Sequence, residues 1–161
     1  MSYRLCRLGA VLIPLMALGC QQPIKWSVQP RVEPHPLKPG KKFTVLCTVT
    51  GDLEQVAWVS AIPLAAPEAV LELKDDGMEG DAKAADGLFT FTRDLPDSVD
   101  AGEYEIEFVV YDKNDEPLQV HSFTVLDRDG KKVVKEVKPE GKAGEEAKVV
   151  ELSAIITVTI E

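Results

Sequence analysis

Apolar and polar residues alternate along most of this chain, a period of two that predicts β-strands rather than helices. The clearest case is 103–112, where Tyr104, Ile106, Phe108 and Val110 alternate with residues that are mostly glutamate. The prolines between residues 23 and 39 place a first strand, around Trp26, at a sheet edge. The other expected strands cover residues 41–50, 55–61, 69–74, 88–93, 118–126, 131–137 and 149–160. The pattern therefore predicts an all-β protein.

Turn residues such as those at 51–52, 63–67 and 113–116 separate these strands. Short strands at this spacing predict an antiparallel Greek-key β-sandwich, which we place over residues 24–127. The tail, 128–161, combines a charged loop with a strongly apolar strand over 149–160. A long apolar edge left exposed would pair with other chains. We therefore expect this strand to join the same domain; the alternative is that it pairs with a partner chain.

One motif marks the type of sandwich. Asp100 and Tyr104 lie in an Asp-Ala-Gly-Glu-Tyr run that resembles a tyrosine corner, in which the hydroxyl bonds back to nearby backbone. With Cys47 and then Trp58, the order resembles that of immunoglobulin domains. Ile106 stands where their second cysteine would be, so the resemblance implies apolar contact among Cys47, Trp58 and Ile106 in place of a disulfide. It implies an Ig-like fold and no particular function.

The segment 75–90 is dense in aspartate and glycine. Its sequence, Asp-Asp-Gly-Met-Glu-Gly-Asp-Ala-Lys-Ala-Ala-Asp-Gly-Leu-Phe-Thr, resembles a signature of bacterial extracellular Ig-like domains of the choice-of-anchor type. The resemblance implies secretion and a surface or periplasmic setting. Ala85 departs from it, because the family often has glycine there.

The same segment predicts a calcium site. Asp75, Asp76, Asp81 and Asp86 offer the hard oxygen ligands that Ca²⁺ prefers, although their spacing is not that of an EF-hand. The alternative is that aspartate and glycine form turns here, since Asp side chains accept backbone N–H bonds and Gly adopts positive φ. We expect no other cofactor.

The N-terminus carries a targeting signal. Arg4 and Arg7 precede an apolar run over 8–18, and Gly19-Cys20 follows, as in a secretory signal. It resembles a bacterial lipoprotein signal, which implies removal of residues 1–19, lipidation of Cys20 and a short tether over 20–23. Ala17 departs from the leucine usual there. An ordinary secretory signal is the alternative, whereas a membrane-spanning helix is disfavoured because the run is short and contains Pro14.

The negative net charge disfavours two classes of partner, nucleic acid and anionic lipid. The net charge is −9, and removal of residues 1–19 would take away Arg4 and Arg7 but no acid, which leaves −11. So acidic a chain repels nucleic acid and anionic lipid, so the acyl chains would have to provide the membrane anchor. Gln21, in place of the aspartate that retains many lipoproteins in the inner membrane, implies the outer membrane in a Gram-negative cell.

The chemistry-bearing residues do not predict an enzyme. His35 and His121 are far apart and lack the neighbours of a nucleophile–base pair or a zinc site, while Cys47 lies unpaired in an apolar strand. We expect a lipid-anchored, extracytoplasmic module that binds or scaffolds a protein or glycan partner through the 75–87 loop and the 113–116 hairpin. The alternatives are an accessory subunit whose 149–160 strand augments another sheet and, more remotely, a carboxylate-dependent hydrolase.

Overall fold

A computed structural model describes residues 25–78, 81, 83–137 and 149–161 of the chain. One short 3₁₀ helix, η1 (Leu53–Gln55), interrupts an otherwise β structure within these ranges. The strands are β1 (Trp26–Glu33), β2 (Lys42–Thr50), β3 (Trp58–Pro63), β4 (Leu71–Leu73), β5 (Leu88–Asp94), β6 (Gly102–Tyr111), β7 (Gln119–Val120), β8 (Phe123–Leu126), β9 (Lys132–Val137), β10 (Val150–Glu151) and β11 (Ser153–Ile160).

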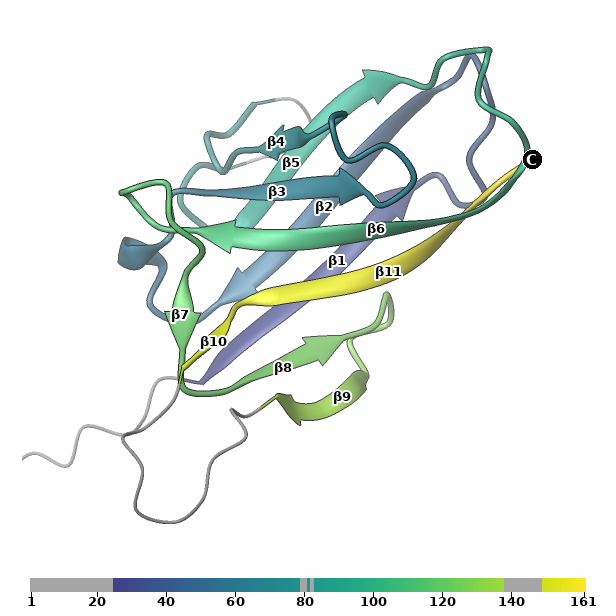
Figure 1. Ribbon diagram of the computed structural model, residues 1–161. Coiled ribbons are helices and arrows are strands. Elements are labelled where there is room, and N and C mark those ends of the chain that lie inside the picture. Colours follow the sequence, from purple (N-terminus) through teal and green to yellow (C-terminus); the bar gives the residue numbers. More distant parts are fainter. Residues whose placement is uncertain (1–24, 79–80, 82, 138–148) are drawn as a thin grey trace, which may run out of the picture.

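The strands form two layers. One sheet has the order β5-β2-β1-β8-β9 and the other β11-β6-β3-β4, while β10 and β7 make a small separate pair. Figure 1 shows the second sheet lying across the first. The expected all-β, Ig-like sandwich is therefore confirmed. One pair departs from the antiparallel expectation, because β1 runs parallel to β8 from Trp26 to Val28.

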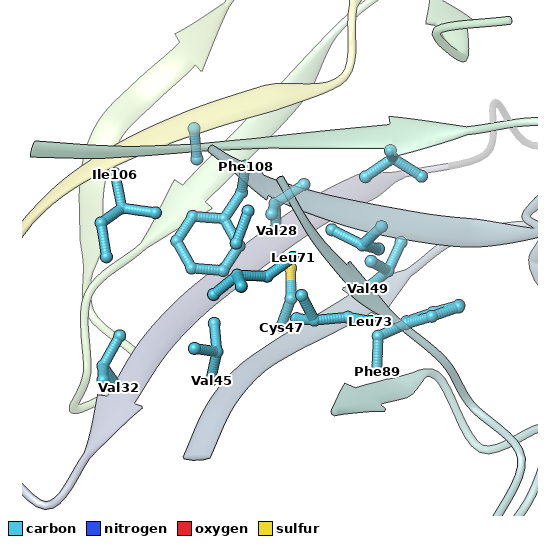
Figure 2. Packing of buried hydrophobic residues seen from close by; sticks show 14 of the residues in the cluster. Val28, Val32, Val45, Cys47, Val49, Leu71, Leu73, Phe89, Ile106 and Phe108 are labelled. Carbon is cyan, nitrogen blue, oxygen red and sulfur yellow. The ribbon is translucent and has the colours of Figure 1, made fainter. Parts of the chain in front are cut away.

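The core lies between the two sheets. Alternate residues of each strand point inward, so Val45, Cys47 and Val49 of β2 point toward the other sheet, where Phe108 of β6 lies opposite Val45 and Cys47 (Figure 2). All four are buried. The removal of apolar surface from water at this interface is the main force that holds the two sheets together.

The first strand is more central than the prolines predicted. β1 lies between β2 and β8 in the middle of its sheet. Its pairing with β8 ends at Val28, whereas its pairing with β2 continues to Glu33. From Pro30 onward β1 therefore has only one neighbour, and a proline there does not interrupt a second ladder.

The apolar strand of the tail completes the four-stranded sheet. All eight residues of β11 pair with β6, from Ser153 opposite Val109 to Ile160 opposite Gly102. The other edge of β11 is covered near its end, where Leu37 N–H donates to the Thr159 carbonyl at 2.9 Å. This segment is thus packed as a strand of the sandwich.

Trp58 lies on the opposite face of its strand from the one expected. Val59 and Ala61 of β3 point into the core, so Trp58 points outward, opposite Tyr111 in register. The two rings stack with centroids 4.2 Å apart. The expected contact of Trp58 with Cys47 and Ile106 is therefore wrong; Trp26, which is 7% exposed, is the tryptophan of the core.

Candidate functional sites

The aspartates of the 75–87 loop bond to the loop's own backbone. The Asp75 carboxylate accepts the N–H groups of Asp86 (3.2 Å) and Gly87 (2.7 Å). The buried Asp81 carboxylate accepts those of Gly77 (2.8 Å) and Lys83 (2.9 Å). Two side chains thereby accept bonds from four backbone N–H groups, those of Gly77, Lys83, Asp86 and Gly87, which would otherwise need water as a partner.

The same carboxylates approach one another. One oxygen each from Asp75, Asp81 and Asp86 lie within 4.8 Å of one another, whereas Asp76 is outside this group and accepts the Met78 N–H at 3.0 Å. These three oxygens are fewer than the six to eight that Ca²⁺ takes, so other oxygens, from loop carbonyls or water, would have to supply the rest. The turn-forming role explains the observed hydrogen bonds without an ion.

Ala85 occupies a position that favours glycine. Its φ is +59°, in the left-handed region, and its N–H lies 3.4 Å from the Asp75 carbonyl. This conformation costs an L-residue with a Cβ about 1 kcal/mol or more. The backbone conformation at residue 85 therefore favours glycine over the alanine that is present.

The 113–116 hairpin is also fixed by its own acids. The Asp112 carboxylate accepts the N–H groups of Asn114 and Glu116, and the bond from Glu116 first, then that from Asn114, lowers the pKa of Asp112. Trp58 Nε1 donates to Asp115 at 3.0 Å and ties the hairpin to β3. The hydrogen bonds of Asp112 and Asp115 are therefore made within the molecule.

The remaining residues singled out from the sequence have structural positions. The Tyr104 hydroxyl donates to the Asp100 carbonyl at 2.9 Å, the bond of a tyrosine corner. Cys47 is fully buried, and this burial raises the pKa of its thiol, so it packs as a small neutral side chain. Cys20, with the signal and tether, lies outside the described residues.

An apolar cavity that the sequence did not predict lies at the other end of the sandwich. Its volume is about 350 Å³, and its lining includes Val158 and Ile160, close to the end of β11 that is marked C in Figure 1. Both sheets and the loop over 64–70 contribute to its wall. The core residues that line it include Leu37, Phe43, Leu71, Ile106, Val158 and Ile160.

The cavity exists because small side chains stand where larger ones could fill the space. The 64–70 loop contributes Ala65, Ala66 and Ala69 to the wall. The same loop also exposes Leu64 (43%) and Val70 (49%), which are not among the residues that line the cavity. An apolar hollow of this kind can hold a small apolar molecule. The feature of the sequence that could have indicated this cavity is the group of alanines in the 64–70 loop.

A second hollow of about 350 Å³ runs between β1, β8 and β11. It is lined by Arg31, Val125 and Ile155 among others, and Ile155 is 55% exposed. Its apolar surface therefore lies beside the outer edge of β11.

Comparison with known proteins leaves the family open. No family model and no curated protein matches the chain. Among solved structures, it is similar to a Niemann-Pick type C2 protein from Japanese carpenter ant, with 15% sequence identity and a TM-score of 0.34. The match covers 59% of this chain and 85% of that chain, and a likeness this low carries no conclusion about function. Within the described residues, no helix has the length and hydropathy needed to cross a membrane.

Proposed function

We propose that this chain is a lipid-anchored, extracytoplasmic Ig-like module that binds a small apolar ligand and catalyses no reaction. The observation that carries the binding role is the apolar cavity between the sheets. The anchor and the compartment are supported by the lipoprotein-like pattern that ends at Cys20. The ligand takes the place of the protein or glycan partner expected from the sequence.

The volume of the cavity supports a binding role. The cavity is open to solvent on one side, because Ala65, Ala69 and Arg93 of its wall are exposed. A hollow of about 350 Å³ lies within the range of natural ligand pockets, roughly 300–1,000 Å³. Apolar cavities also stay dry and take up small apolar molecules. The competing explanation is a packing defect, which a larger side chain would simply repair.

Binding can be tested by filling the cavity. In the double variant Ala66→Leu, Ala69→Leu, two added side chains would occupy the space beside Leu71. We expect the neutral probe N-phenyl-1-naphthylamine to bind the unaltered protein saturably, with a rise in fluorescence, and to bind the double variant at least tenfold more weakly. Ala57→Leu, at an exposed position at the opposite end, is the matched control and should leave binding unchanged. Circular dichroism establishes that each variant is folded.

Two results would refute the binding role. One is the absence of saturable probe binding to the unaltered protein, and the other is equal binding by the filled variant. A filled variant that is more stable than the unaltered protein, when the latter binds no probe, would identify the cavity as a packing defect.

The anchor has a separate test. Mass spectrometry of the protein isolated from its native membrane should find Cys20 as the first residue, with acyl chains attached. An intact Met1, or an unmodified Cys20, would contradict lipidation and leave the cavity proposal untouched.

A second candidate function is supported by β11. This eight-residue strand has no charged residue, ends its sheet and exposes Ile155. Exposed apolar edges of this kind pair with other strands, so β11 could augment a sheet of another subunit, in the simplest case a second copy. Sedimentation velocity should then show concentration-dependent association that Ile155→Lys abolishes and that Ser98→Lys, in an exposed turn, leaves unchanged. A monomer at all concentrations would exclude self-association.

A further inference from the structure

We infer that the cavity ligand is a fatty acid, with its alkyl chain inside the cavity and its carboxylate on Arg93. This inference rests on the proposed binding function and names the ligand class for the same site. It follows from where Arg93 lies, from what surrounds it and from the shape and chemistry of the remaining wall.

Arg93 stands at an inward-facing position. In the β2·β5 ladder, Cys47 lies opposite Phe89, Val45 opposite Phe91 and Phe43 opposite Arg93. Directly paired residues share a face of the sheet, so the arginine continues the row that Phe89 and Phe91 begin inside the sandwich. It occupies the last place in this row, where the strand reaches the cavity, and it is one of the lining residues.

Arg93 is exposed, so its guanidinium belongs to the opening of the cavity and not to the apolar interior. Among the described residues that line the cavity, Arg93 carries the only formal charge. The other polar group at hand, the Tyr104 hydroxyl, already donates to the Asp100 carbonyl. The neighbouring Asp94 points to the other face of the strand, opposite Lys42 in register. An arginine with this setting suits a carboxylate, to which its fork of N–H donors can bond in a bidentate manner.

The rest of the wall suits one alkyl chain. It consists of core side chains from both sheets, prolines and the loop alanines, none of which offers a charged side chain. Its volume of about 350 Å³ is at the small end of the usual range for ligand pockets, which favours a single chain over a two-chain phospholipid. An apolar chain that ends in a carboxylate matches this combination of an apolar interior and one cation at the opening.

Arg93 has one competing role. β5 ends its sheet, and an inward-pointing charge on such a strand is a known protection against pairing with other molecules. In that case removal of the charge would promote association between copies without changing the affinity for any ligand. The two roles therefore predict different measurements on the same variant.

The test compares an acid with its matched alcohol. Full chain carrying Cys20→Ser, so that no attached acyl group competes, is titrated with dodecanoate and with dodecanol below their aggregation limits, by displacement of N-phenyl-1-naphthylamine. The variants are Arg93→Gln and, as the control with the same change of charge, Lys113→Gln, which lies in the exposed hairpin at the opposite end of the sandwich. Far-ultraviolet circular dichroism verifies the fold of each.

We expect both compounds to bind the unaltered protein, and Arg93→Gln to weaken dodecanoate roughly two- to five-fold, the effect of a partly exposed ion pair. Dodecanol should bind Arg93→Gln as before, and Lys113→Gln should bind both compounds unchanged. If dodecanoate binds Arg93→Gln with unaltered affinity, the carboxylate contact is refuted while the binding module stands; accompanying self-association would then assign the edge-protecting role. If neither compound nor the probe binds the unaltered protein, the proposed function itself fails.

Discussion

The two ends of the sandwich are covered by loops of opposite character. At the end where β5 begins and β6 finishes, Asp75, Asp81 and Asp112 hold loop backbone with their carboxylates. At the other end, the 64–70 loop brings alanines over the core and leaves a cavity. The acidic end is conspicuous in the sequence, yet these three carboxylates already bond to backbone within the protein. The apolar end contains an unfilled cavity, which provides space for a ligand.

The largest effect should come from the acidic end. Asp81→Ala removes a buried carboxylate that accepts two backbone N–H groups, and bonds to a charged group are worth about 1.5–3 kcal/mol. We expect a loss of about 2 kcal/mol in the free energy of unfolding, measured with urea. Asp76→Ala, at an exposed position with a single N–H bond, should cost less than about 0.5 kcal/mol. Equal losses would show that the loop does not depend on its buried acid.

A smaller loss is expected next to the cavity. Tyr104→Phe removes the hydroxyl that donates to the Asp100 carbonyl, which should cost about 1 kcal/mol. Because the ring that lines the cavity remains, affinity for N-phenyl-1-naphthylamine should stay the same. Tyr111→Phe, which keeps the stack on Trp58 at the acidic end, is the control for urea unfolding. A Tyr104→Phe variant as stable as the unaltered protein would refute a structural role for this bond.

The strands and the acidic loops could be predicted because their signals are local. A period of two places residues 103–112 in a strand, and the structure has it at Gly102–Tyr111. Aspartate beside glycine predicts turns for a reason that lies within a few residues, the bond from a side chain to nearby N–H groups. Such features need no knowledge of which strands become neighbours.

Three features were predicted wrongly or missed: the edge position of β1, the contacts of Trp58, and the cavity. All three depend on contacts between segments that are distant in the sequence. The position of β1 depends on its pairing with β8, almost a hundred residues later. Trp58 follows Cys47 at a spacing typical of immunoglobulin domains, but a shift of one residue along β3 decides whether a side chain faces the core or solvent. The cavity depends on the volumes of side chains from the 64–70 loop, β2, β6 and β11 together, which no local pattern records.

Relief of backbone strain should raise stability at the acidic end. Ala85→Gly replaces a residue held at φ +59° with one that adopts this conformation at no steric cost. The gain is reduced by the greater freedom of glycine in the unfolded chain, so we expect the free energy of unfolding to rise by about 0.5–1 kcal/mol. Ala84→Gly, at a neighbouring position without positive φ, should instead lower it slightly. A loss in both variants would argue against strain at residue 85.

The smallest effect expected is that of calcium on thermal stability. It tests the contrast between the acidic end and the cavity end most directly. If the carboxylates of Asp75, Asp81 and Asp86 serve the loop backbone, millimolar Ca²⁺ should change the melting temperature by less than about 1 °C relative to a chelator. A site half-filled at that concentration would add about 0.4 kcal/mol, or about 1–2 °C for a domain of this size, and a tight site several degrees. A rise that Asp75→Asn abolishes and Asp94→Asn preserves would identify a metal site. The acidic end would then bind a ligand too, and the contrast with the cavity end would be one of ligand chemistry alone.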